Sequence, residues 1–502
     1  MTRINRILIA NRGEIAVRIM RTARRMGIEC VAIRTAAEPD AMYLSMADII
    51  HHEEDELAEI PVFLDVEKLI GIALKTECDA LHPGYGFLSE NAYFAEKCRD
   101  NGIIFIGPSP DAIYKMGNKP VARQIALKHR IPMAMGSAGS VANEDEAINQ
   151  AAMIGYPVII KAASGGGGRG MRVVRQESDM EKMFILASRE AEKAFNDPGV
   201  FIEKYIENPK HIEFQILGDT HGNIIHLGER ECSIQRKHQK LLEEAPSPAL
   251  DEDIRATMGE TAVRIAGAVG YYSAGTVEFL LDSEHNFYFM EMNTRIQVEH
   301  PVTEMVTGID LIEQQIRIAS GEKLTIRQED VRLTGWAIEC RINAEDVQAG
   351  FAPAPGKIEK ISLPDEPGIR IDTGVRAGSS IVASYDSMIA KLIVTGKNRQ
   401  ETIINAKQAL DKVWIKGTKT TLPFFRMLMR NPLFQAGTFT TAFIEKDLEK
   451  FYQCSEYEEA IAAWIATKLF VEENLTDKSA DISFEQGREL TPWLLRKRLT
   501  QF

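Results

Sequence analysis

Cysteines are few in this sequence, and they are not grouped as a disulfide framework or a metal cluster requires. The six cysteines lie far apart and include no CxxC pair: Cys30, Cys78, Cys98, Cys232, Cys340 and Cys454. Disulfide-rich domains and zinc sites bring several cysteines close together in the sequence. The sequence therefore predicts reduced thiols, with neither a disulfide framework nor a zinc cluster.

Long apolar runs are also missing. No run reaches the roughly 18 apolar residues expected of a transmembrane helix, and the first apolar segment, RILIA, passes at once into the polar residues NRGE. A secretory signal has a longer apolar core. The sequence thus predicts no membrane partner and a cytoplasmic location.

Positive charge is in deficit. The 502 residues carry a net charge of −13, with 45% hydrophobic and 26% charged residues. This composition is typical of a globular protein, and the length suggests about three domains of roughly 150 residues each. Because general nucleic-acid binders are basic, we expect no nucleic-acid partner, although a local basic pocket can still hold a nucleotide.

The apolar segments predict an α/β protein with several regions. Near the N-terminus RILIA, NRGE and CVAI, with an apolar-periodic stretch before CVAI, indicate a strand, a turn, a helix and a strand. Residues 1–115 are therefore predicted to form a Rossmann-like open sheet. Residues 116–330 are predicted to contain antiparallel strands, and residues 331–446 to form a mixed α+β domain with a helix at 399–413. We expect residues 447–502 to form a charged helical tail.

Four consecutive glycines stand out in VIIKAASGGGGRGMRVV, residues 158–174. A glycine-rich loop lets backbone N–H groups approach a phosphate, but the P-loop and the dinucleotide fingerprint both require a helix directly after the loop. Here β-like segments stand on both sides, which favours a flexible flap that closes over a ligand. Lys161 at its entrance is well placed to meet phosphate oxygens. The alternative is a solvated hairpin tip.

The segment HIEFQILGDTHGNIIHLGE alternates between polar and apolar residues and contains a turn. Such alternation predicts an antiparallel hairpin with one polar and one apolar face. The polar face is predicted to carry His211, Glu213 and Gln215, and the apolar face Ile212, Phe214 and Ile216.

A second predicted hairpin carries acidic residues. TVEFLL and NFYFMEMN are separated by the turn DSEHN. If the turn is centred between residues 284 and 285, Glu278 faces Glu291, Leu280 faces Phe289, and Asn293 points to the same side as the two carboxylates. Facing carboxylates repel each other, so this arrangement favours a site for Mg²⁺ or Mn²⁺. An exposed hairpin with solvated charges, or a one-residue slip in register, is the alternative.

If the second strand stays extended, the same parity brings Arg295, Gln297 and Glu299 to the face of the two carboxylates. Farther upstream, ERECSIQRKHQK concentrates positive charge within an acidic protein. Its basic residues are either a solvated loop or part of a binding site for a second small anion: Arg230, Arg236, Lys237, His238 and Lys240.

Together these segments closely resemble those of biotin carboxylases, which belong to the ATP-grasp superfamily. The resemblance covers about residues 3–446 and rests on segments that occur in the family's order: IANRGEIAVRI, HPGYGFLSEN, IGYPVIIKAASGGGGRGMR, ECSIQRKHQKLLEEAP, FMEMNTRIQVEHPVTE and ECRINAED. It implies an N-terminal biotin carboxylase domain, a central ATP-grasp domain with a mobile lid at about 132–206, and a C-terminal domain.

The resemblance also implies roles for individual residues. The implied ATP contacts are Lys119, Lys161, Gly165, Gly166, Gly167, Gly168, Glu203, Lys204, Ile206, His211, Gln235, His238, Glu278 and Glu291. Glu278, Glu291 and Asn293 resemble the metal ligands, and Lys240, Arg295, Gln297 and Val298 resemble the bicarbonate-binding set. Glu299 resembles the base that deprotonates bicarbonate, and Arg341 the residue that steadies the biotin enolate; with Arg295 and Lys240 they form the implied catalytic set. Arg18 and Glu90 match positions associated with a homodimer interface.

The implied reaction is ATP- and bicarbonate-dependent carboxylation of biotin through carboxyphosphate. No AMKM-like biotinylation segment occurs, so we expect biotin to arrive on a separate carrier protein and a carboxyltransferase subunit to complete the reaction. The final acceptor stays open among acetyl-CoA, propionyl-CoA, pyruvate and 2-oxoglutarate. Two alternatives remain: another ATP-grasp carboxylate ligase, or a catalytically silent nucleotide-binding subunit.

Three departures from the family pattern accompany the resemblance. Ser164 replaces one glycine of the loop, EREC replaces a common ERDC, and Trp336 stands where a histidine is frequent. The length beyond residue 447 is more like the carboxylase subunit of two-subunit pyruvate carboxylases than the short bacterial subunits of acetyl-CoA carboxylase.

Overall fold

The structure is a computed structural model that describes residues 2–53, 60–137, 139–162, 171–195, 197–382, 385–446 and 463–468. The chain divides into two compact units, Met1–Leu448 and Glu449–Phe502. In the second unit residues 463–468 are helical, and the rest of the predicted tail lies outside the described residues. Among the helices that the structure describes, none combines the length and the apolar character needed to span a membrane.

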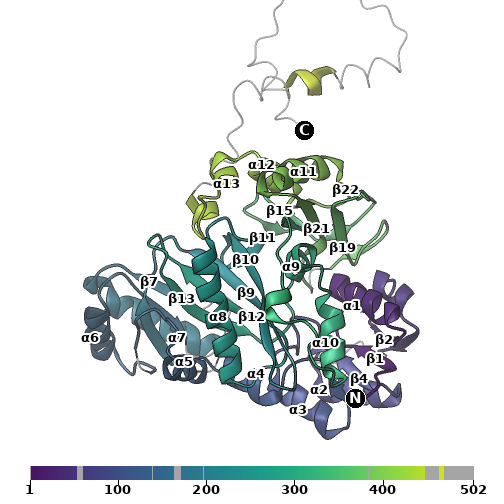
Figure 1. The fold of residues 1–502 in the computed structure, drawn as a ribbon. Coiled ribbons are helices and arrows are strands. Elements are labelled where there is room, and N and C mark those ends of the chain that lie inside the picture. The colour runs from purple at the N-terminus through teal and green to yellow at the C-terminus, as the bar shows by residue number, and fades with distance from the viewer. Residues whose placement is uncertain are drawn as a thin grey trace, which may run out of the picture. The chain divides into compact units, whose positions relative to one another are not determined.

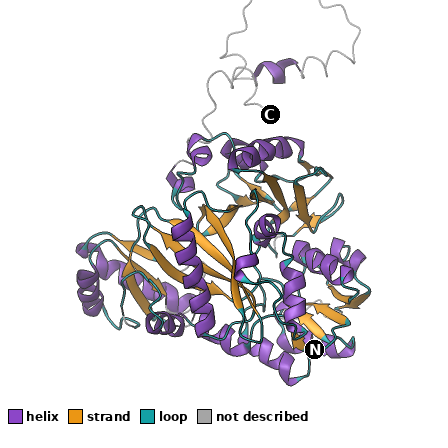
Figure 2. Ribbon diagram, in the orientation of Figure 1, coloured by secondary structure: helices purple, strands orange, loops and turns teal. Residues whose placement is uncertain are grey.

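A parallel sheet forms the N-terminal part, as predicted (Figures 1 and 2). Its central strand, β1, is almost entirely buried, which suits a parallel sheet covered on both faces. In spatial order the strands are β3 (Ile49–His52), β2 (Glu29–Arg34), β1 (Arg6–Ile9), β4 (Ala80–His82) and β5 (Ile104–Phe105). The helices are α1 (Gly13–Arg25), α2 (Val66–Lys75), α3 (Ala92–Asp100) and α4 (Pro110–Gly117), and short 3₁₀ turns lie at Met42–Met46 and Val62–Leu64.

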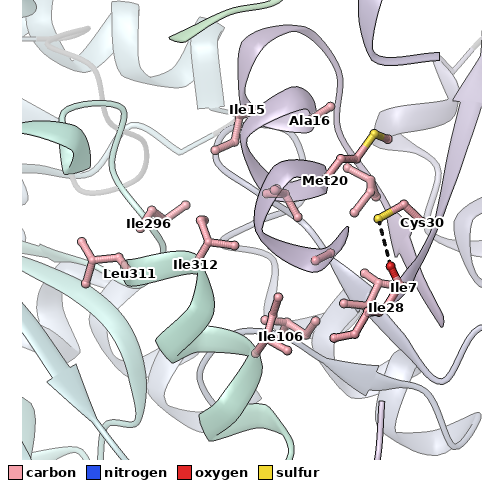
Figure 3. Close-up of a cluster of buried hydrophobic side chains, with 14 of the residues drawn as sticks. Ile7, Ile15, Ala16, Met20, Ile28, Cys30, Ile106, Ile296, Leu311 and Ile312 are labelled. Atoms are coloured by element: carbon pink, nitrogen blue, oxygen red, sulfur yellow. Dashed lines mark hydrogen bonds between the residues drawn. The ribbon is translucent and has the colours of Figure 1, made fainter. Parts of the chain in front are cut away.

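The N-terminal sheet shares a hydrophobic core with a helix about 300 residues away in the sequence, α10 (Leu311–Ala319). Figure 3 shows Ile15 of α1 near Ile312 of α10, and Met20 and Leu311 belong to the same cluster. Ile296, which lies in neither helix, is fully buried in the same cluster. The segment around Ile296 is therefore anchored to the N-terminal part.

Residues 119–204 form a small sheet covered by helices. β6 (Val158–Ala162) pairs antiparallel with β7 (Arg172–Val174) and β8 (Val200–Lys204). This pairing confirms that strands stand on both sides of the glycine loop, whose residues 163–170 lie outside the described residues. The helices are α5 (Lys119–Lys128), α6 (Glu144–Ile154) and α7 (Met180–Phe195), the last preceded by a 3₁₀ turn at Glu177–Asp179.

An eight-stranded antiparallel sheet forms the centre of the first unit and confirms the predicted antiparallel region. It runs without a break through the predicted boundary at residue 330. In spatial order its strands are β13 (Phe287–Asn293), β12 (Ser273–Leu281), β9 (Lys210–Gly218), β10 (Ile224–Arg236), β11 (Gln239–Ala245), β14 (Trp336–Asn343), β21 (Met388–Gly396) and β19 (Ile369–Thr373).

The two faces of this sheet differ in character. α8 (Glu252–Ala268) packs on an apolar face that includes Phe214 and Phe279. The opposite face carries charged residues and is covered partly by α9 (His300–Thr307), whose Val302 and Val306 contact Ala245 and Ala337. Side chains alternate between the faces of each strand, so one sheet supplies both a core and a polar site.

The C-terminal part of the first unit adds helices and short strand pairs. The helices are α11 (Arg399–Lys412), α12 (Leu422–Leu428) and α13 (Pro432–Ala436), with a 3₁₀ turn at Gln328–Asp330 before the region. α11 confirms the predicted helix at 399–413. The paired strands are β15 (Glu345–Asp346) with β16 (Ala352–Pro353), β17 (Gly356–Lys357) with β20 (Ser380–Ile381), and β18 (Lys360–Ser362) with β22 (Trp414–Lys416).

Candidate functional site

The polar face of the central sheet begins on β9, where the predicted alternation is confirmed. Ile212, Phe214 and Ile216 lie in the hydrophobic core. On the other face, the ring Nε2 of His211 lies 2.9 Å from an oxygen of Glu278, and Glu213 pairs with Arg230 and with Lys240. Strand periodicity therefore aligns these polar groups in one row.

The register of β12 and β13 places Glu278 opposite Glu291 and Thr276 opposite Asn293, as predicted for the two carboxylates. The predicted pairing of Leu280 with Phe289 is wrong, because Phe289 faces Phe279 and Leu280 faces Tyr288. The shift occurs between Glu278 and Phe279, where one extra residue in β13 forms a bulge. Because of the bulge, Phe289 can join the core while Glu291 reaches the polar face.

Glu278 is the most densely contacted carboxylate of the site. One of its oxygens lies 2.9 Å from Lys240 Nζ and accepts from the side-chain amides of Asn293 at 2.8 Å and Gln297 at 3.1 Å. Burial opposes its ionisation, but Lys240 and His211 outweigh burial and hold the pKa of Glu278 well below its usual range. Glu278 is thus a fixed anion at neutral pH.

Glu291 has a different environment from its partner. Within the described residues no hydrogen bond or ion pair involves its side chain. Desolvation and the facing charge of Glu278 raise the pKa of Glu291, while Lys119 opposes the shift. Two facing carboxylates with an amide oxygen nearby match the oxygen ligands that Mg²⁺ prefers. This donor set fits a divalent cation, which would relieve the repulsion.

Glu299 lies between two cationic groups. One oxygen is 2.7 Å from Lys240 Nζ, and the other accepts from Arg341 at 2.7 Å. Burial would favour the neutral acid, but Lys240 and Arg341 hold the pKa of Glu299 well below its ordinary value. Glu299 is therefore ionised, which is the form of a carboxyl group that can accept a proton.

The segment that carries Arg295 and Gln297 is not a strand. β13 ends at Asn293 and Glu299 directly precedes α9, so the extended-strand argument for residues 295–299 is wrong, although the side chains do converge. Arg295 donates to Gln297 Oε1 at 2.8 Å and to Asn293 Oδ1 at 3.2 Å. Between Arg295 and Gln297, the buried Ile296 fixes the backbone in the core of Figure 3.

Glu203, one of the residues expected to contact ATP, lies between two cationic side chains. Lys161 Nζ lies 2.6 Å from one oxygen of Glu203 and Arg123 lies 2.7 Å from the other. Burial would disfavour charge on Glu203, but Lys161 and Arg123 lower its pKa. Burial and the nearby charge of Lys161 lower the pKa of Lys119, with Glu291 opposing. The positive groups are thus close enough to influence one another.

Other expected ATP contacts lie near this group or outside the described residues. Lys204 donates to the carbonyls of Gly155 and Tyr156 at 2.9 and 3.0 Å, and Ile206 lies two residues after the end of β8. Gln235 Nε2 lies 3.5 Å from His211 Nδ1, and His238 is exposed in the two-residue turn between β10 and β11. Four of them cannot be placed: Gly165, Gly166, Gly167 and Gly168.

The basic stretch at 229–240 is a hairpin and not a solvated loop. Arg236 pairs with Gln239 across the turn, whose Lys237 and His238 both have positive φ, as a tight hairpin turn requires. Arg230 is fully buried and donates to Glu213 at 2.5 Å. Of the basic residues in the stretch, Lys240 pairs with Glu278 and Glu299 of the site. Arg230 pairs with Glu213.

Several residues of the site were not predicted from the sequence. Glu243, Glu339 and Lys391 are buried on the polar face and had no signal in the sequence, whereas the alternation of β9 did predict that Glu213 lies on this face. The two residues expected at a homodimer interface have contacts within the chain. Arg18 pairs with Glu304 at 2.8 Å and Asp310 at 2.9 Å, and Glu90 lies 2.9 Å from Arg295.

Comparison with known proteins gives the family. Family models match three consecutive parts of the chain: the biotin carboxylase N-terminal domain at 3–113, the carbamoyl-phosphate synthase L chain ATP-binding domain at 118–327, and the biotin carboxylase C-terminal domain at 339–446. Biotin carboxylase 1 of Bacillus subtilis is 53% identical over 443 residues, which cover 88% of this chain and 98% of that protein. The chain belongs to the biotin carboxylase family. As a member it is an ATP-dependent carboxylase with an ATP-grasp fold.

Other biotin carboxylases and their relatives are similarly close. The pyruvate carboxylase of Methanothermobacter thermautotrophicus has a subunit that is 49% identical over 442 residues, covering 88% of this chain and 90% of that one. The biotin carboxylase domain of the Hydrogenobacter thermophilus 2-oxoglutarate carboxylase superimposes with a TM-score of 0.87 at 46% identity, covering 91% of this chain and all of that one. That structure is of a dimer in complex with MgADP, ADP and bicarbonate.

One departure from the biotin carboxylase pattern has a clear structural place. The indole Nε1 of Trp336 donates to Glu244 at 2.7 Å, and Arg399 pairs with the same carboxylate at 2.7 Å. Glu244 and Trp336 lie on the face of the sheet opposite the site. Trp336 therefore contacts β11 on the face opposite the site. Another departure, Ser164, lies outside the described residues.

Proposed function

We propose that the chain carboxylates biotin on a separate carrier protein, using ATP and bicarbonate through carboxyphosphate, as the first half-reaction of an acyl-CoA or pyruvate carboxylase. The observation that carries the proposal is the position of Glu299 between Lys240 and Arg341, beside the Glu278 and Glu291 pair. This arrangement supplies a base, cations for two anionic substrates and a carboxylate pair for a divalent cation.

Bicarbonate is proposed to bind among Lys240, Arg295, Gln297 and the backbone of Val298. In the proposed complex, the ammonium group of Lys240 interacts with bicarbonate and therefore interacts less strongly with Glu299. Because Lys240 lowers the pKa of Glu299, this exchange raises the pKa of Glu299 just when it must accept a proton. Glu299 thus becomes a better base only when the substrate is in place.

ATP is proposed to bind beside Lys119, Lys161, Lys204 and His238, with the loop at Gly165, Gly166, Gly167 and Gly168 closing over the phosphates. Lys161 would exchange Glu203 for a phosphate oxygen, because charge-assisted contacts to phosphate are strong. When bound at Glu278, Glu291 and Asn293, Mg²⁺ or Mn²⁺ would supply positive charge that neutralises the phosphates. Arg341 is then free to stabilise negative charge on the ureido oxygen of biotin.

A second candidate function is another carboxyphosphate-forming ligase, because residues 118–327 match the ATP-binding domain of carbamoyl-phosphate synthase. Lys240, Arg295 and Glu299 would serve bicarbonate activation in either case. Arg341 favours the biotin reaction, because it lies beyond Glu299 on β14 and outside the matched segment. A silent nucleotide-binding subunit is disfavoured, since the residues implied in catalysis are present and in contact.

The proposed partners are a biotin carboxyl carrier protein and a carboxyltransferase subunit, and the proposed assembly includes a homodimer. The dimer found for the Hydrogenobacter thermophilus domain supports the last point. The proposed location is the cytoplasm, because the described cysteines are buried free thiols, which suit a reducing compartment.

The decisive experiment measures ADP formation by the purified chain with bicarbonate, with and without a biotinylated carrier domain. We expect turnover that requires bicarbonate and rises when biotin is present, with the label of ¹⁴C-bicarbonate appearing on the carrier. Turnover that responds to bicarbonate but is indifferent to biotin would favour the other ligase. No bicarbonate-dependent turnover would support the silent subunit.

A further inference from the structure

A row of charged residues crosses the whole polar face of the central sheet. Toward the β19 edge of the sheet, Asp372 lies opposite Lys391, and Lys391 lies opposite Arg341. Toward the β13 edge, Arg230 lies opposite Glu213, and Glu213 lies opposite Glu278. Glu243 of β11 and Glu339 of β14 occupy the middle of this row, directly opposite each other. They are the part of the row to which the proposed reaction gives no role.

Glu243 and Glu339 form an unusual pair. Both side chains are completely buried, and directly opposite positions in an antiparallel ladder bring side chains within about 5 Å at Cβ. Within the described residues none of their four carboxylate oxygens accepts a hydrogen bond of good geometry. Two buried carboxyl groups so placed do not both ionise readily, since each charge opposes the other. Two facing, buried carboxyl groups destabilise the fold and call for a functional reason.

The contact of Glu243 with Arg341 supplies that reason. Arg341 Nη2 lies 2.6 Å from Glu243 Oε1 and 2.7 Å from Glu299 Oε2. The same guanidinium nitrogen therefore bridges one carboxylate on a rigid strand and one at the start of α9. Arg341 Nε has no hydrogen-bond partner among the described residues, so these two carboxylates supply the anionic contacts that hold the guanidinium group.

We propose that Glu243 is a positioning residue for Arg341, which it holds in the site independently of Glu299. The inference rests on the proposed function, in which Glu299 accepts a proton and loses its charge. At that moment Arg341 loses half of its anionic support, and without a second carboxylate it would be free to swing away from the place where biotin's ureido oxygen becomes negative. Glu243 keeps the guanidinium group there, and Glu339 lies directly opposite it on β14.

The charges around Glu243 give the position a pH dependence. Arg341 and Glu339 face it from β14, Glu299 from the start of α9, Cys232 from β10, and Lys240 from its own strand. Burial raises the pKa of Glu243 to about 7, the charge of Glu299 adds to the effect, and Arg341 and Lys240 oppose it. Burial also keeps the pKa of Glu339 well above its usual value, and Glu243 adds to the shift. Glu243 should therefore become ionised, and able to hold Arg341, as the pH rises through about 7.

The test compares Glu243→Gln with Glu244→Gln. Glu244 is the next residue of β11, is equally buried and is paired with Arg399, but it lies on the opposite face. We expect Glu243→Gln to lower kcat for bicarbonate- and biotin-dependent ADP formation about tenfold or more, as loss of a charge-assisted contact does. In Glu243→Gln the fall of kcat below about pH 7 should disappear. The affinity for ATP should not change. Glu244→Gln should keep this fall. A wild-type kcat with the same fall in Glu243→Gln would overturn the proposal.

Stability separates this role from a purely structural one. A carboxyl group whose pKa is raised on folding stabilises the fold at low pH and loses that contribution as pH rises from its unfolded value through its folded value. At pH 8 Glu243→Gln should therefore melt at the wild-type temperature or above it, although its kcat is low. A large fall in melting temperature that accounts for the lost activity would contradict a positioning role.

A second experiment tests the contact without turnover, so that failure of the proposed function does not hide the result. In a crystal structure of Glu299→Gln, Arg341 should remain in contact with Glu243. If Arg341 instead leaves Glu243, the inference is wrong, whether or not the wild-type chain carboxylates biotin. If the wild-type chain shows no biotin-dependent turnover while Arg341 stays at Glu243, only the proposed function fails.

Discussion

At the scale of single residues, Lys161 illustrates how the site holds charge ready for exchange. Its ammonium group lies 2.6 Å from Glu203, which also pairs with Arg123. Glu203 therefore still pairs with Arg123 when Lys161 contacts a phosphate instead. The cost of releasing Lys161 is reduced, because the carboxylate is not left unpaired.

Lys161→Gln should weaken ATP binding about tenfold to a hundredfold, since hydrogen bonds to charged groups contribute about 1.5–3 kcal/mol. Isothermal titration with a non-hydrolysable ATP analogue measures the change. Lys115→Gln is the control, because Lys115 pairs with Asp111 on the surface of α4 and surface pairs contribute little. Equal affinities in Lys161→Gln and the wild type would rule out the proposed phosphate contact.

Glu299→Gln tests the proposed base at the same scale. The substitution preserves size but removes the proton acceptor between Lys240 and Arg341. We expect biotin-dependent ADP formation to fall about 10²- to 10⁴-fold, the usual contribution of general acid–base catalysis, while the dissociation constant of ATP stays the same. Full activity in Glu299→Gln would refute the assignment.

At the scale of elements, the strands were predictable where local alternation decides the structure. His211 to Ile216 followed period two, and the facing of Glu278 and Glu291 followed from the turn between them. Beyond Glu278 the prediction failed, because a bulge depends on how Phe289 packs against the core and not on local pattern. Glu243 and Glu339 could not be predicted, since their pairing joins strands almost 100 residues apart.

The apolar face of the same sheet gives an element-scale prediction. The ring of Phe279 contacts those of Phe214, Phe287 and Phe289, with centroids 5.6–6.4 Å apart. Phe279→Ala would leave a cavity under the bulge and should cost about 3–5 kcal/mol, with a lower melting temperature in calorimetry. The exposed Tyr114→Ala on α4 should change it little. A neutral Phe279→Ala would show that this cluster does not support the hairpin.

At the scale of the whole first unit, Lys391 connects parts that are far apart in the sequence. From β21 its buried ammonium group lies 3.0 Å from Glu14 of α1 and donates to the carbonyl of Val298 at 2.9 Å. The N-terminal helix, the proposed bicarbonate segment and the C-terminal part of the sheet thus meet at one cation. Domain prediction from the sequence separates these regions, whereas the charge that joins them appears only in the folded chain.

Lys391→Met should therefore affect both stability and bicarbonate binding. Methionine has a similar length but leaves Glu14 without its cation and Val298 without its donor, and breaking a buried pair costs about 3–5 kcal/mol. We expect a lower melting temperature and, in the folded fraction, a KM for bicarbonate raised more than the KM for ATP, because Lys391 donates to Val298 of the proposed bicarbonate set. Lys412→Met, which removes an exposed pair with Glu366, should change neither constant. Equal increases in both KM values would show that Lys391 supports the fold in general and not the bicarbonate segment.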